Sequence, residues 1–74
     1  LDMGPRTSET LQTRVYNYLQ ENGPATDIQI QVGLGMDGST ERPRRIELFN
    51  QGRIVDHGVH RQLNGRNATV WAVA

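Results

Sequence analysis

Arginine is the side chain in this sequence best suited to binding chemistry, and three arginines fall within four residues. Arg42, Arg44 and Arg45 lie in a polar segment, and Arg66 follows an Asn-Gly pair further along the chain. All eight basic residues are arginine and none is lysine. Because a planar guanidinium can form two parallel hydrogen bonds, arginine suits guanine edges and phosphate groups. The set predicts a base- or phosphate-binding surface, although compositional bias in a GC-rich genome would produce it equally well.

Charge is divided between two parts of the chain, while the formal net charge is zero. Residues 7–41 carry five acids and one base, whereas residues 42–66 carry six arginines and two acids. The neutral total argues against a general polyanion binder. The division itself is typical of a protein with a one-sided nucleic-acid face.

Other kinds of site have little support in the sequence. His57 and His60 are spaced like a metal-binding pair, but there is no cysteine, no third ligand is near, and on a strand the two would face different ways. The glycines between Gly33 and Gly38 lack the lysine that a phosphate-binding loop needs. A chain of 74 residues without a catalytic triad leaves little room for an active-site cleft. We expect no enzyme activity, no metal, no cofactor and no small-molecule substrate.

Length and hydropathy predict one small domain. No apolar run approaches the ~20 residues that span a membrane, and the absence of cysteine suits a reducing cytoplasm. We expect residues 1–7 to form a flexible N-terminal arm and residues 8–74 to form the domain. The expected location is the cytoplasm of a bacterial host cell, in association with the nucleoid and without membrane contact.

Hydrophobic periodicity predicts two helices in the first half of the chain. Apolar residues recur at helical spacing over about residues 9–21, and Asn22-Gly23-Pro24 ends that helix. Residues 26–34 are ambiguous when taken alone, because the apolar positions fit both a strand, by alternation, and a helix, by the four-residue spacing of Ile30 and Leu34. The neighbouring segments favour a short helix followed by a tight turn, as in a helix-turn-helix.

A third helix is expected to begin at a cap provided by Ser39 or Thr40 and to run to about Gln51, before Gly52. Pro43 would then fall in the first turn, where its missing N–H costs least.

On a helical wheel of this segment, Arg45 lies in the middle of the apolar arc. We expect its stem to pack and its head to pair with an acid. Arg44 falls on the opposite, polar side of the wheel, whereas Ile46 points near solvent or a partner without an evident reason.

The last third of the sequence predicts a β-hairpin. Ile54 begins an extended segment, and Asp56-His57-Gly58 should form a bend or bulge. The strand then pairs back through Asn64-Gly65, the strongest short hairpin signal, onto residues 68–73. Trp71 is expected to pack on the first or third helix, and a short strand at residues 25–26 would join the sheet.

Several of these motifs together resemble small winged helix-turn-helix proteins encoded by phages and prophages. The similarity covers about residues 8–73, and its most specific part is Arg42-Pro43-Arg44-Arg45-x-Glu47-Leu48. Further similar positions are Thr26-Asp27, Gly35-Met36, Gly52 and Gly65-Arg66-x-Ala68-x-Val70-Trp71. The resemblance implies a three-helix core, a wing of two or three strands, and DNA binding.

The chain departs from this group at two positions. Glu41 stands where an apolar residue is frequent, and Gln29 stands where an acid is common. An acid at position 41 would either pair with Arg45 or weaken the core.

We therefore predict an α+β winged helix-turn-helix, three helices followed by a β-hairpin wing, that binds double-stranded DNA with sequence preference. The third helix, about residues 39–51, would enter the major groove, and the wing, about residues 59–73, would contact the DNA backbone. The expected role is in phage or prophage DNA transactions or in transcriptional control. One such module covers few base pairs, so useful specificity would need a homodimer, a tandem site or a second domain. The residues expected to contact DNA are Ser39, Thr40, Arg42, Arg44, Arg45, Arg61, Arg66 and Asn67.

A second interpretation is a winged-helix module that binds protein in a phage or replication assembly. The zero net charge favours it, as do Ile46 and Tyr16 as candidate surface residues. Winged helices host both roles, so the fold alone does not decide between them.

Overall fold

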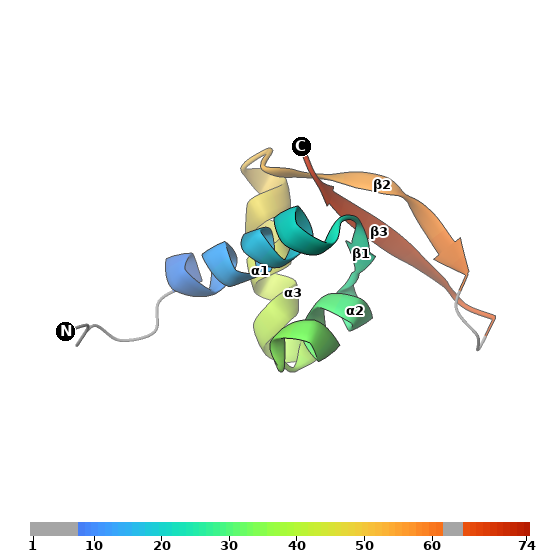
Figure 1. Cartoon of the computed structure of the whole chain (residues 1–74), viewed down its shortest axis with the longest axis horizontal. Helices are drawn as coiled ribbons and strands as arrows, with labels where there is room; N and C mark the ends of the chain where they lie inside the picture. Colours follow the sequence, from blue (N-terminus) through green and yellow to red (C-terminus); the bar gives the residue numbers. More distant parts are fainter. Residues whose placement is uncertain (1–7, 62–64) are drawn as a thin grey trace.

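In the computed structural model, which describes residues 8–61 and 65–74, three helices pack beside a three-stranded antiparallel sheet (Figure 1). In chain order the elements are α1 (Ser8–Asn22), β1 (Ala25–Thr26), α2 (Asp27–Leu34), α3 (Gly38–Asn50), β2 (Ile54–Arg61) and β3 (Asn67–Val73). The expected arm at residues 1–7 and part of the expected hairpin turn, residues 62–64, lie outside the described residues. No helix in the described ranges is long and apolar enough to cross a membrane.

The ambiguous segment forms the helix α2, as its sequence context favoured. Thr26 caps it through a reciprocal pair: the Thr26 hydroxyl oxygen accepts from the Gln29 backbone N–H at 3.3 Å, and Gln29 Oε1 accepts from the Thr26 N–H at 2.9 Å. Such a capping box satisfies two donors that a helix start otherwise leaves open. The helix ends at Gly35, whose φ of 67° is a left-handed conformation that glycine adopts at little cost.

The start of α3 differs from the prediction that Ser39 or Thr40 would cap it. Asp37 is the cap: its Oδ1 accepts from the Thr40 backbone N–H at 2.9 Å and from the Ser39 hydroxyl at 3.0 Å. The helix therefore begins two residues earlier than a Ser39 cap would allow, and three residues earlier than a Thr40 cap would allow. Pro43 consequently lies in the second turn, where it has no N–H for the Ser39 carbonyl.

β2 and β3 form the predicted antiparallel hairpin, which projects from the helices in Figure 1. Asp56 lies opposite Trp71 and Gly58 opposite Val70, so His57 is an extra residue and forms the expected bulge. Gly58 has a φ of 129°, which a residue with a Cβ rarely adopts. The short strand at residues 25–26 is also present and pairs with β3, which makes β3 the central strand.

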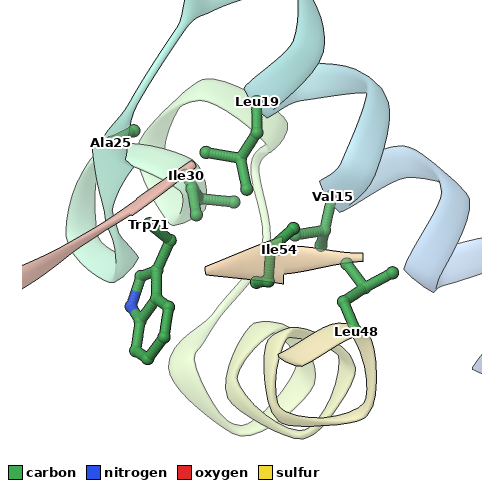
Figure 2. Close-up of a cluster of buried hydrophobic side chains, with 7 residues drawn as sticks. All are labelled: Val15, Leu19, Ala25, Ile30, Leu48, Ile54 and Trp71. Atoms are coloured by element: carbon green, nitrogen blue, oxygen red, sulfur yellow. The ribbon is translucent and has the colours of Figure 1, made fainter. Parts of the chain in front are cut away.

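The core joins every helix and strand (Figure 2). Its buried members are Val15, Leu19, Ala25, Ile30, Leu48, Ile54 and Trp71. Trp71 reaches from β3 toward α3, where the Phe49 ring meets it edge-on at a centroid distance of 5.3 Å. The prediction that Trp71 packs on the first or third helix is confirmed for the third, and this packing ties the hairpin to α3.

Candidate nucleic-acid interface

α3 presents one exposed arc to solvent, here called the outward arc. Its members recur three and four positions apart: Ser39, Arg42, Pro43, Ile46, Phe49 and Asn50. At 100° per residue they span roughly 120° of the helix circumference, with Ile46 near the middle. Leu48 and Glu41 are buried on the opposite side and fix which way the arc faces.

Beside the outward arc lies a surface hollow of about 420 Å³ between the helices and β3. Its lining consists of Asp27, Ile28, Arg42, Arg45, Arg66, Asn67, Ala68, Thr69 and Trp71. Four of the predicted contact residues are in this lining, two from α3 and two from the start of β3 and the residue before it. The fold thus brings together guanidinium groups that are distant in the sequence.

Arg42 is the exposed cation of this lining that comes from α3. Its guanidinium lies against the first residue of the helix, because a Cβ added at Gly38 would come within 2.8 Å of Arg42 Nη1. Gly38 therefore leaves room for the side chain to lie back over the start of α3. Arg66 and Asn67, both exposed, face the same hollow from the β3 side.

Arg45 forms part of the wall of the hollow and is held by the fold. Its Nε and Nη2 donate to the two carboxylate oxygens of Asp27 at 2.9 and 2.7 Å. Its guanidinium also lies 4.4 Å from the centroid of a Trp71 ring. This two-pronged ion pair and ring stacking are the packed, acid-paired arrangement that the helical wheel predicted, and they neutralise the carboxylate in the hollow.

Arg44 does not join the other predicted residues. Its Nη2 donates to Glu47 Oε2 at 3.1 Å, and Glu47 Oε1 in turn accepts from Gln12 Nε2 of α1 at 2.7 Å. Arg44 thus lies on the flank of α3 that faces α1, with a side chain only 19% exposed. The helical wheel placed Arg44 on the polar side, opposite the apolar arc, but in the structure α1 covers that flank and the side chain is mostly buried.

The remaining predicted contacts lie around the edges of the site. Ser39 is exposed on the outward arc, although its hydroxyl donates to the Asp37 cap. Thr40 is half-buried and contributes its backbone N–H to the same cap. Arg61 lies opposite Asn67 in the hairpin ladder, but its side chain is outside the described part of the structure.

Glu41 is fully buried behind the site. Its Oε1 accepts from Gln31 Nε2 at 3.0 Å, and its Oε2 has no hydrogen-bond partner among the described residues. Burial, and then the nearby Asp27 carboxylate, raise the pKa of Glu41 to about 7. The alternative in which Glu41 pairs with Arg45 is not realised, because Asp27 occupies the guanidinium.

Sequence reasoning missed several residues of the lining. Thr69 could have been predicted, because side chains two residues apart in a strand lie on the same face, and Thr69 therefore lies on the same face of β3 as Trp71. Asp27 and Ile28 were not, because their segment read equally well as strand or helix. His57 and His60 lie exposed on β2, and no group of three metal-ligating side chains occurs in residues 8–61 and 65–74.

No family model matches the chain, and no curated protein matches it in sequence. The geometry and charge of the outward arc and the hollow are therefore the features that point to a function.

Proposed function

We propose that this chain is a winged helix-turn-helix module that binds double-stranded DNA with sequence preference. α3 enters the major groove with its outward arc, and the β2–β3 hairpin lies against the flanking backbone. The observation that carries this proposal is the convergence of Arg42 from α3 with Arg66 and Asn67 from the β3 side on one hollow.

The charge on this side of the molecule supports the proposal. Both acids of α3 are directed away from the outward arc: Glu41 is buried, and Glu47 bonds to Gln12 of α1. The acid in the hollow, Asp27, is paired with Arg45. A phosphate chain laid across the arc and the hollow would therefore meet guanidinium groups without an opposing free carboxylate from these three acids.

The dimensions of α3 also suit a DNA groove. Thirteen helical residues make a rod roughly 20 Å long, and the major groove of B-form DNA admits one α-helix. The arc offers donors at Arg42 and Asn50, which are side chains that bond to base edges and phosphates. Because one such helix covers few base pairs, we propose that binding uses two copies or a second domain.

The test is a titration of the whole chain with a pool of random-sequence duplex DNA, in which binding is monitored by the NMR chemical shifts of the backbone amides. We expect shifts at residues 39–46 and 65–69 that fade as salt is raised. Arg42→Ala and Arg66→Ala should weaken binding. Arg14→Ala is the matched control, because Arg14 borders a separate groove between α1 and α2. If these amides do not move at low salt, the proposal fails.

A second candidate function, binding to another protein, is favoured by apolar side chains on α2. Ile28 is 48% exposed and Val32 is 78% exposed, one helical turn apart. Tyr16 adds little to this candidate, because the Arg53 guanidinium covers its ring at 4.3 Å. If the chain binds protein and not DNA, the amide shifts should not change in the DNA titration, and Val32→Asp should abolish binding to the protein partner.

A further inference from the structure

Ile46 occupies the centre of the outward arc, which is where a helix in the major groove comes closest to the base edges. Its side chain is 45% exposed and is not part of the buried core cluster. A β-branched residue at an exposed helix position gains nothing from helix propensity. Neither the buried core cluster nor helix propensity therefore requires an isoleucine at this point.

The surroundings of Ile46 on the arc are mixed rather than apolar. Arg42 lies one turn before it and Asn50 one turn after it, both exposed. Phe49, three residues after Ile46 on the arc, packs its ring against Trp71. Arg42, Ile46 and Asn50 therefore place a cation, an aliphatic group and an amide in one row along α3.

The edge of B-form DNA in the major groove has a matching set of features. Guanine offers two acceptors to an arginine, adenine offers a donor and an acceptor to an asparagine, and the methyl group of thymine is the one apolar feature. We propose that Ile46 reads the 5-methyl group of a thymine and is a specificity-determining residue of this helix. This inference rests on the proposed DNA binding and adds to it the identity of one base.

The geometry also places that thymine relative to the base read by Arg42. Residues four apart on a helix are separated by about 6 Å along its axis, and base pairs are stacked about 3.4 Å apart. The thymine therefore lies within about two base pairs of the guanine that Arg42 contacts.

The experiment begins with selection of bound duplexes from a random-sequence pool by the full chain. Each thymine of the selected site is then replaced singly by uracil, which lacks only the 5-methyl group, and the affinity is measured by fluorescence anisotropy. Burying one methyl group contributes about 0.8 kcal/mol, which corresponds to about a fourfold change in affinity. The wild-type chain should lose about that factor at one thymine near the Arg42-dependent guanine.

Two variants separate the role of Ile46 from general effects. Ile46→Ala should bind the thymine site about fourfold more weakly and should not distinguish thymine from uracil there. Val32→Ala also shortens an exposed aliphatic side chain, but one that belongs to α2 and not to the arc of α3, so it should keep the wild-type discrimination. A thermal unfolding curve for each variant verifies that the fold is retained.

Each outcome decides the inference. Thymine-to-uracil sensitivity that disappears in Ile46→Ala and persists in Val32→Ala supports it. A selected site without thymine, a wild-type chain that ignores every methyl group, or an Ile46→Ala chain that keeps the discrimination overturns it while leaving DNA binding intact. If no duplex is retained in the selection, the proposed function and the inference both fall.

Discussion

The inward side and the outward arc of α3 use the same kinds of side chain in opposite ways. On the inward side and its flanks, charged groups are engaged within the fold: Arg45 with Asp27 and Trp71, Arg44 with Glu47, and Glu41 with Gln31. On the outward arc Arg42 is exposed beside the hollow. Arg42 and Arg45 are three residues apart, yet one is available to a partner and the other is part of the packing.

This difference shows that burial, rather than residue type, decides which arginine can serve a partner. A buried charge must be paired, because leaving it alone in a low-dielectric surrounding is costly. Substitutions on the inward side should therefore change stability, whereas substitutions on the arc should change binding.

The largest effect is expected for Arg45→Ala on stability. The change leaves the Asp27 carboxylate without its two guanidinium donors and removes the stacked cation from Trp71. We expect a loss of about 3 kcal/mol in the free energy of unfolding, measured by urea denaturation. Arg42→Ala is the control and should stay within about 0.5 kcal/mol of the wild type. Equal stability of the two variants would contradict the proposed division between an inward side that stabilises the fold and an outward arc that binds a partner.

The second effect is a pH dependence that originates at Glu41. Its pKa is raised from 4.5 to about 7 in the folded chain, so the folded state holds a proton that the unfolded state releases between these values. The free energy of unfolding should therefore fall as pH rises from about 4.5 to about 7 and then level off. Glu41→Gln removes the titrating carboxyl group and should be more stable than wild type at pH 8, by an amount on the order of 2 kcal/mol, with little gain near pH 4.5.

Glu47→Gln is the matched control for the pH experiment. Glu47 is on the same helix, but its carboxylate is partly exposed and already paired with Arg44. Loss of that pairing should give no gain in stability at pH 8. A Glu47→Gln chain that gains as much as Glu41→Gln would contradict a specific cost of burying the Glu41 charge.

The third prediction compares two arginines by DNA affinity. Arg42→Ala should lose about 1–3 kcal/mol of binding free energy if the Arg42 guanidinium of the wild-type chain contacts a guanine. Arg44→Ala should bind within about twofold of wild type and lose less than about 1 kcal/mol of stability, because its partner Glu47 is 36% exposed and keeps the hydrogen bond from Gln12. Fluorescence anisotropy at fixed salt measures the first effect, and thermal unfolding the second. Similar losses of affinity in both variants would show that the two flanks of α3 are not distinct.

The smallest effect is expected at Arg66, at the entry to β3. Replacement by alanine should weaken binding almost equally for all DNA sequences and should reduce the slope of log affinity against log salt by about 1, since the expected contact is to a phosphate. Affinity measured at several salt concentrations gives this slope. A sequence-dependent loss with an unchanged slope would instead assign Arg66 to a base contact.

Much of the fold could be predicted from the sequence because its signals are local. The helix-ending glycine at position 52 and the bulge before Gly58 were both expected and both are present. The start of α3 was missed because three polar side chains that can cap a helix, Asp37, Ser39 and Thr40, lie within four residues. Asp37 is the cap because its carboxylate reaches two donors at once.

The candidate site was less predictable because it depends on how α3 is rotated against the other elements. The wheel identified Arg45 as packed and acid-paired, but the identity of its partner, Asp27, depends on the approach of α2. The placement of Arg44 depends in the same way on α1, which covers one polar flank of the helix. Periodicity determines the order of residues around a helix, whereas contacts between elements determine which of those residues remain exposed.

The extra residue in β2 has a consequence for self-association. β2 is an outer strand of the sheet, and an outer strand offers open backbone groups on which another chain can pair. At Asp56–Gly58 the regular ladder is interrupted, and the Gly58 N–H is taken up locally by the Asp56 carboxylate at 2.9 Å. A strand from a neighbouring molecule could not pair regularly there, because the edge of β2 is bent and one of its backbone N–H groups already has a partner. The bulge therefore protects the hairpin against edge-to-edge aggregation.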